Sequence, residues 1–167
     1  MTTTQNRHGS ATVELQGDRE LVITRTFDAP AALVFKAMTT PELVQRWWGF
    51  ETAEWKVCEI DATVGGTWRY VVSQNDFEVA FHGTYEEIDA PSRIVSTEVF
   101  EGADPGDDST ASRNTVTLVE QDGTTTMTTH VRHALPEHRD AQLQAGMEGG
   151  MQVSFDRLED LVRSLAA

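Results

Sequence analysis

The feature that most constrains the fold is the order strand, two short helices, strand within residues 23–70. Pro30 ends the first strand and suits the first turn of a helix, where its missing N–H would have had no partner. Residues 31–39 are too few for a helix that crosses back over a sheet to a parallel strand. We therefore expect a small helical lid, with helices over residues 30–38 and 41–48, after the first strand.

The remaining segments predict an antiparallel sheet followed by helix. Residues 13–27 alternate apolar and polar side chains around a turn signal, which suggests a hairpin or a bent first strand. Residues 54–133 alternate strand-like segments with turn residues, as in an antiparallel meander. A weak helical turn over residues 137–145 precedes a longer helix over residues 147–165, whose apolar side chains recur every three or four positions.

The predicted sheet has one apolar face, and the predicted long helix has one apolar side. Both apolar surfaces are buried when the sheet curls around the helix. We therefore predict an α+β fold with a curved antiparallel sheet wrapped around a long C-terminal helix. One domain is expected over residues 12–167, after a disordered start at residues 1–11. Residues 101–112 are rich in acidic and small side chains and are expected to form a mobile loop.

The composition narrows the possible partners and compartment. A length of 167 residues suits one ordinary domain with a core of its own. The formal charge of −14 comes from 27 acidic and 13 basic side chains without an offsetting basic cluster, so nucleic acid and anionic membrane surfaces should be repelled. The single cysteine, Cys58, cannot form an internal disulfide and is expected as a buried thiol, which favours a reducing, cytoplasmic location. No segment reaches the ~20 apolar residues of a membrane span.

Several short motifs recur in the order found in a known superfamily. The chain resembles the START-like, or SRPBCC, superfamily, and within it bacterial proteins similar to the C-terminal domain of the activator of the Hsp90 ATPase. The matching segments are residues 23–30, 33–35, 40–43, 47–49, 58–61, 65–66, 82–85 and 147–158. The resemblance implies a helix-grip fold with a cavity between the sheet, the lid and the C-terminal helix. It implies no particular activity, because this superfamily uses one cavity-forming fold for several functions.

Aromatic and sulfur-containing side chains are expected to line this cavity. Methionine facing tryptophan and tyrosine is typical of small-molecule cavities, although each such residue taken singly is more often part of a core. Trp68 and Met151 are expected to face each other across the cavity. Of the adjacent Trp47 and Trp48, one should anchor the lid and the other lie nearer the mouth. The expected ligand-binding set is Trp47, Trp48, Trp68, Tyr70, Phe81, Tyr85, Phe100, Met127, Met147, Met151 and Phe155, with Trp55 beside it.

Two acidic residues, Glu98 and Glu120, share the strand parity of the apolar face. Each is costly there unless it is paired, placed at an open rim or used in catalysis, because burial disfavours the charged carboxylate. If the protein has a general base, the predicted catalytic set is Glu98 with Tyr70 or Tyr85 as a hydrogen-bonding partner.

The histidines and glycines are weaker candidates. By strand parity His82 and His130 face solvent, and His133 is expected at the rim. The sequence has neither a helical H-x-x-x-H pair nor a cysteine pair, so it indicates no metal site, and we expect no cofactor. The Gly65–Gly66 pair lacks the flanking residues of a phosphate loop and predicts a tight turn.

The preferred interpretation is a START-like protein that binds a small apolar or amphipathic molecule, as a monomer or a homodimer. Two alternatives stay open: a module that contacts an Hsp90-type chaperone through its surface, and a cofactor-free cyclase- or hydrolase-type enzyme that uses the same cavity. A closed, dry core would favour the interaction module, and an open apolar cavity the carrier. A carboxylate with a shifted pKa inside that cavity would favour the enzyme.

Overall fold

The computed structural model of the protein describes residues 11–49, 52–101 and 111–167. The described strands are β1 (Thr12–Gln16), β2 (Glu20–Phe27), β3 (Glu54–Ile60), β4 (Thr67–Gln74), β5 (Phe77–Asp89), β6 (Arg93–Phe100), β7 (Ser112–Gln121) and β8 (Thr124–Arg132). The described helices are α1 (Ala31–Thr39), α2 (Pro41–Val44), α3 (Pro136–Gln144) and α4 (Met147–Ala166).

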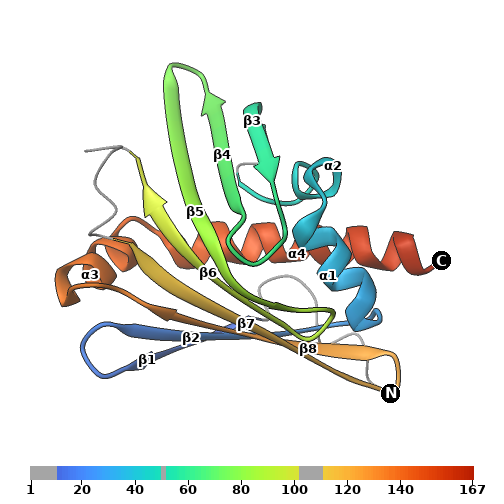
Figure 1. Ribbon diagram of the computed structural model, residues 1–167. Coiled ribbons are helices and arrows are strands. Elements are labelled where there is room, and N and C mark those ends of the chain that lie inside the picture. Colours follow the sequence, from blue (N-terminus) through green and yellow to red (C-terminus); the bar gives the residue numbers. More distant parts are fainter. Residues whose placement is uncertain (1–10, 50–51, 102–110) are drawn as a thin grey trace.

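The strands form one antiparallel sheet in the order β1-β2-β8-β7-β6-β5-β4-β3. Strands β3 to β8 are neighbours in chain order, as the meander predicts, and β2 returns beside β8 to extend the sheet. Figure 1 shows the sheet curving around α4, which passes behind β4 to β6, with α1 and α2 beside its C-terminal half. The predicted α+β helix-grip fold is therefore confirmed.

The lid helices differ in length from the prediction. The first helix spans Ala31–Thr39, close to the expected range, but the second ends at Val44 instead of residue 48. Beyond it, the N–H groups of Trp47 and Trp48 both donate to the carbonyl oxygen of Val44, at 3.2 and 3.0 Å. The tryptophan pair thus lies on hydrogen-bonded turns that lead to Gly49, whose φ of +86° is left-handed.

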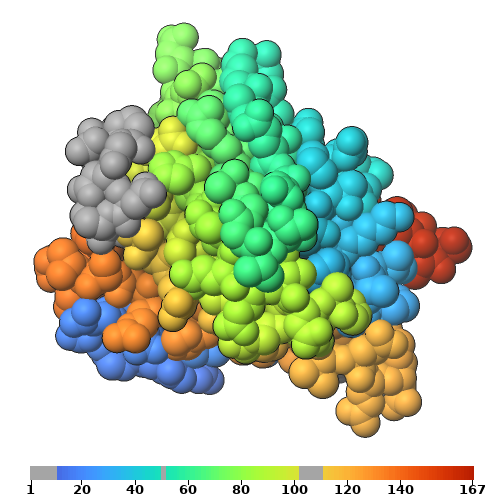
Figure 2. Space-filling model, viewed as in Figure 1, coloured from blue at the N-terminus to red at the C-terminus, as the bar shows by residue number. Residues whose placement is uncertain are grey.

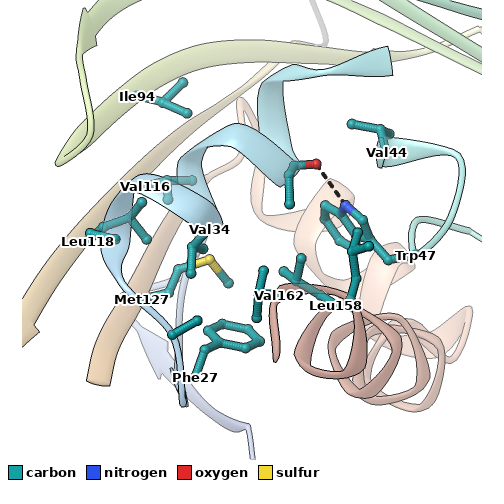
Figure 3. Close-up of a cluster of buried hydrophobic side chains, with 14 of the residues drawn as sticks. Phe27, Val34, Val44, Trp47, Ile94, Val116, Leu118, Met127, Leu158 and Val162 are labelled. Carbon is teal, nitrogen blue, oxygen red and sulfur yellow. Dashed lines mark hydrogen bonds between the residues drawn. The ribbon is translucent and has the colours of Figure 1, made fainter. Parts of the chain in front are cut away.

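The apolar interior divides into two clusters. The larger cluster joins the sheet to α1 and α4 and includes Phe27, Met127, Leu158 and Val162, each at most 1 % exposed. Figure 3 shows these side chains pointing toward one another, together with the hydrogen bond that Trp47 Nε1 donates to the carbonyl oxygen of residue 37 at 3.0 Å. The smaller cluster consists of Ala11, Leu21, Ile23 and Val131, with partly buried neighbours from β1, α3 and α4.

A buried arginine fastens β2 to α4. Arg25 alternates in step with the apolar residues of its strand and is 2 % exposed. Its guanidinium lies 2.8 Å from an Asp156 oxygen and 3.7 Å from a Glu159 oxygen, and 5.3 Å from the centroid of the Phe27 ring. The alternation of β2 therefore places a charged residue on the inner face, a position that the candidate residues from the sequence did not include.

The predictions for the N-terminus and the long loop fall mostly on residues that the structure does not describe. Residues 1–10 and 102–110 lie outside the described ranges. Ala11, expected in the disordered start, is instead buried and exchanges two hydrogen bonds with the side chain of Gln152, at 3.1 and 2.8 Å. One domain over residues 12–167 stays a prediction.

Figure 2, in the same view, shows strands β3 to β5 covering much of the front of the molecule, with α1 beside them. The last turns of α4 project at one side. Within the described part of the chain, no helix combines the length and apolar character needed to cross a membrane.

Candidate functional site

A series of aromatic rings leads from the surface to the interior along the inner face of β3 to β6. Phe100 is 53 % exposed, and its ring centroid lies 5.3 Å from that of Phe81. Phe81 in turn lies 5.4 Å from Trp48, which lies 5.0 Å from the ring of Tyr70. Trp68, the innermost member, lies 4.7 Å from Tyr70. The rings form a continuous apolar wall with one accessible end.

Polar groups gather at the buried end of this wall. Tyr70 on β4 and Tyr85 on β5 are 9 % and 5 % exposed, and Glu98 lies on β6. Asn114 Nδ2 on β7 donates a hydrogen bond to Glu98 Oε1 at 3.1 Å. We call these four residues the Glu98 cluster. Within the described residues, neither phenol hydroxyl has a hydrogen-bond partner, and the same holds for Glu98 Oε2.

Gly83 allows the indole of Trp68, the innermost ring of the wall, to approach the sheet closely. It pairs with Trp68 across the β4–β5 ladder, and a Cβ at this position would collide with the Trp68 indole nitrogen and with the carbonyl group of Thr97. The indole instead crosses the glycine and donates from Nε1 to the Thr97 carbonyl oxygen at 3.2 Å. The group that approaches the sheet at Gly83 is therefore the indole of Trp68.

The Gly65–Gly66 turn positions Tyr85. The N–H of Gly65 donates to the carbonyl oxygen of Tyr85 at 2.8 Å, and the N–H of Tyr85 donates to that of Gly66 at 2.9 Å. Gly65 has a φ of +87°, which residues other than glycine rarely adopt. The predicted tight turn is confirmed, and it fixes the backbone that carries one of the two buried phenols.

Burial controls the protonation of the Glu98 cluster. It raises the pKa of Glu98 above its usual value, and the hydrogen bond from Asn114 opposes this in part. It also raises the pKa of both phenols, so they remain protonated donors at neutral pH. Smaller electrostatic effects on the pKa of Tyr70 come from nearby groups that would be negative when ionised, Tyr85, Cys58 and Glu98.

The structure divides the expected ligand-binding set into three groups. The aromatic wall contains Trp48, Trp68, Tyr70, Phe81, Tyr85 and Phe100, with Trp55 5.7 Å from Trp48. The large cluster contains Trp47 and Met127 and also includes the buried members of the wall, Trp68, Tyr70 and Tyr85, while Phe155 packs against both clusters. Met147 and Met151 pack against the small cluster.

Two of the expected positions need correction. Met151 packs against the small cluster and not against the large cluster that contains Trp68, so the expected pairing of the two side chains is not seen. The helical stripe predicts which side of α4 is apolar but not which part of the sheet each turn of the helix meets. Phe100 is on the expected face, since its ring contacts Phe81, but it is exposed instead of interior because it lies at the end of its strand.

One tryptophan of the pair is more exposed than the other, as expected, although neither lies on a helix. Trp47 is 6 % exposed and donates its indole N–H to the backbone of α1. Trp48 is only partly buried and contacts the rings of Trp55, Tyr70 and Phe81. The first therefore anchors the lid, and the second belongs to the aromatic wall.

The remaining acid candidate caps a helix. Glu120 Oε1 accepts a hydrogen bond from the N–H of Ala31 at 2.8 Å, where the positive end of α1 favours a carboxylate. Glu120 is exposed. Its side chain is thus paired at the rim, one of the outcomes expected for an acid of this parity.

The histidines pair with neighbours outside the Glu98 cluster. His82 Nδ1 lies 2.8 Å from Glu101, which Arg69 also contacts, and His130 pairs with Glu20. The hydrogen bond from Arg69 is the main reason that the pKa of Glu101 falls to about 2. His133 contacts Gln142, and burial lowers its pKa.

Cys58 lies beside the aromatic wall and is partly buried. Burial raises the pKa of its thiol to about 11, so the thiol stays protonated and unreactive at neutral pH. Among the residues with described positions, no group of three or more His, Cys, Asp or Glu side chains could hold a metal ion.

A groove also lies between α4 and the segment that follows α2, and none of the predicted site residues lines it. Its volume is about 270 Å³, and it is lined by Arg46, Arg157, Asp160, Leu161 and Ser164. Arg157 donates to the carbonyl oxygens of Gly49 and Arg46 at 3.3 and 2.9 Å. The groove is polar and contains no residue of the aromatic wall.

The comparisons with solved structures agree with this architecture. A protein from Rhodobacter sphaeroides superposes with a TM-score of 0.83 at 22 % identity, covering 93 % of this chain and 100 % of its own. Protein Ms6760 from Mycobacterium smegmatis gives 0.80 at 25 % identity, covering 91 % and 96 %. A protein from Staphylococcus epidermidis gives 0.79 at 26 % identity, covering 93 % and 96 %. Among curated proteins no match is found.

A curved antiparallel sheet wrapped around a C-terminal helix, with a short helical insert after the first strands, defines the START-like class of proteins. The family described as "Activator of Hsp90 ATPase homolog 1-like protein" matches residues 28–163, and this chain belongs to that family. The resemblance noted from the sequence motifs is thereby confirmed.

Proposed function

We propose that the protein binds a small amphipathic molecule against the aromatic wall, with the polar end of the molecule at the Glu98 cluster. The observation that carries the proposal is that the hydroxyl oxygens of Tyr70 and Tyr85 have no hydrogen-bond partner among the described residues and keep some accessible surface, although the two residues are only 9 % and 5 % exposed. Donors that are unpaired and accessible in mostly apolar surroundings are the kind of polar group that orients a bound small molecule.

The wall supplies the apolar half of this site. Trp48, Trp55 and Phe81 are partly buried, so each keeps some surface that a ligand can cover. Small-molecule sites are mostly aromatic and apolar, with a few convergent polar groups that fix the orientation of the ligand. The wall and the Glu98 cluster supply these two components on adjacent strands.

The first test uses a neutral fluorescent probe, N-phenyl-1-naphthylamine, whose emission rises in apolar surroundings. Phe81→Ala should weaken probe binding, because it removes the ring that joins Phe100 to Trp48. Phe77→Ala is the matched control, since Phe77 lies at the start of the same strand and is 56 % exposed. Equal binding by both variants would contradict the proposal.

The second test is native mass spectrometry of the protein purified from its own host. A co-purified small molecule that is lost in Phe81→Ala would support binding at the wall. Protein that takes up neither a host molecule nor the probe would instead favour the other reading of the family name, a contact with an Hsp90-type chaperone.

A further inference from the structure

The Glu98 cluster has the parts of a site for proton transfer at carbon. Glu98 Oε1 accepts a hydrogen bond from Asn114, and Oε2 has no partner among the described residues. The phenols of Tyr70 and Tyr85 lie on the neighbouring strands of the same face. We propose that the protein catalyses the isomerisation of an apolar carbonyl compound, with Glu98 moving the proton and Tyr70 and Tyr85 stabilising the enolate oxygen. This activity rests on the proposed function, because its substrate is the molecule bound at the aromatic wall.

Asn114 gives Glu98 a defined orientation. Its amide donates to Oε1, so Oε2 is the oxygen directed to other partners. Glu98 is partly buried, and Oε2 is not among the fully buried side-chain atoms without a partner. Among the described residues, no Lys, Arg or His lies within ion-pair distance of this carboxyl group. Because no cation stabilises the carboxylate, desolvation makes it a stronger base than an exposed glutamate.

The phenols are the donors left free in this part of the interior. The indole N–H of Trp68 is used by the Thr97 carbonyl group, and Asn114 donates to Glu98. The hydroxyls of Tyr70 and Tyr85 have no acceptor among the described residues and remain protonated at neutral pH. Preorganised donors of this kind stabilise an oxygen on which negative charge develops.

The reaction balances without a cofactor. Glu98 Oε2 takes a proton from the carbon next to the carbonyl group, the C–H electron pair forms a C=C bond, and the carbonyl π electrons move to oxygen. The phenol hydroxyls hydrogen-bond this enolate oxygen. The substrate must carry a C=C bond next to the deprotonated carbon, so that the enolate extends over it. Glu98 then returns the proton to the far carbon of that bond, the C=O bond re-forms with the C=C bond shifted into conjugation, and the carboxylate is regenerated.

The test uses 5-nitrobenzisoxazole, a small aromatic probe of carbon-bound proton removal. A base takes the proton on its ring carbon, the N–O bond breaks, and a coloured phenolate forms whose oxygen the tyrosines can hydrogen-bond. We expect Glu98→Gln to lower kcat/KM by about 100-fold or more, the usual contribution of a general base. Tyr85→Phe should lower it by up to about 100-fold, as for the loss of one oxyanion donor.

The pH profile separates a base from a structural residue. For the unmodified protein, kcat/KM should rise with pH through an inflection above 4.5, the ordinary pKa of a glutamate, because burial raises that of Glu98. Glu98→Asp keeps a carboxylate and should retain the inflection at lower activity, whereas Glu98→Gln should lose it. Glu101→Gln is the control, since Glu101 pairs with Arg69 and His82 outside the cluster and should leave the profile unchanged.

Displacement of N-phenyl-1-naphthylamine by the substrate probe distinguishes the two proposals. Displacement with turnover that depends on Glu98 supports both. Displacement without turnover, or with turnover that survives Glu98→Gln, overturns proton transfer and leaves ligand binding intact. Binding of N-phenyl-1-naphthylamine that the substrate probe does not displace overturns proton transfer alone. If neither molecule binds, the proposed function is overturned, and the activity with it.

Discussion

Glu159 and Glu98 are two carboxyl groups in the interior whose pKa burial raises, but their surroundings differ. Glu159 on α4 is 3 % exposed, lies 3.7 Å from Arg25 and 3.6 Å from Arg163, and accepts the N–H of Asp28 at 3.0 Å. Among the described residues, the side chain of Glu98 on β6 receives one hydrogen bond, from the neutral side chain of Asn114.

The difference separates a structural charge from a chemical one. The cations around Glu159 balance its charge and join β2 to α4, so its removal should affect stability first. Among the described residues, Glu98 forms no ion pair that links two elements of the fold, and one of its oxygens has no partner. Its removal should therefore affect binding or chemistry first. Burial alone does not make a carboxyl group functional, and its partners decide which role it has.

The largest expected effect comes from removing the arginine that pairs with Glu159. Arg25→Met should lower the free energy of unfolding by about 3–5 kcal/mol, because Asp156 and Glu159 would keep their charges in the interior without the arginine. Urea denaturation measures this loss. The matched control is Arg163→Met, whose side chain is 33 % exposed, and an equal loss in both variants would contradict the special position of Arg25.

The next effect tests the packing of α4 against the two clusters. Leu158→Ala should cost about 2–5 kcal/mol, because Leu158 is fully buried in the large cluster. Met151→Ala should cost less, since its side chain is only partly buried against the small cluster. Denaturation curves give both values. Strong weakening of probe binding by Met151→Ala would restore the original expectation that Met151 faces Trp68.

A smaller effect concerns the contribution of Glu98 to the stability of the protein as a function of pH. Its pKa is raised in the folded state, so the folded protein binds more protons than the unfolded chain, and stability falls as pH rises above about 4.5. Glu98→Gln removes this fall. The two proteins should therefore be equally dependent on pH below 4.5, and the variant should gain relative stability above it.

Unfolding free energies measured at several pH values would show this difference. The contribution of Glu159 cancels because both proteins contain it. A difference that shrinks with rising pH would mean that Glu98 is stabilised as a carboxylate, and the contrast with Glu159 would fail.

The smallest effect is expected on the Arg69–Glu101 pair. Two hydrogen bonds of 3.0 and 2.9 Å join these side chains, but Arg69 is largely exposed. Surface ion pairs contribute little, so Glu101→Gln should change the free energy of unfolding by less than about 1 kcal/mol. Urea denaturation measures the difference, and a loss as large as that of Arg25→Met would show that this pair is also structural.

Local rules predicted much of the candidate site. Alternation in the strands placed Tyr70, Tyr85 and Glu98 on one face, and the structure brings them together on neighbouring strands. The same rule applied to β2 would have placed Arg25 inside. Its partners could not be predicted in this way, because Asp156 lies 131 positions away in the chain.

The sequence by itself determined the antiparallel sheet, the helical insert and the apolar side of α4, because each depends on side-chain periodicity and turn residues within a short segment. Only the tertiary structure decided that Met151 packs away from Trp68 and that Phe100 remains exposed. It also decided that Glu98 receives one neutral partner while Glu159 receives two cations. These outcomes depend on where α4 crosses the curved sheet, and that position is set by contacts between residues far apart in the chain.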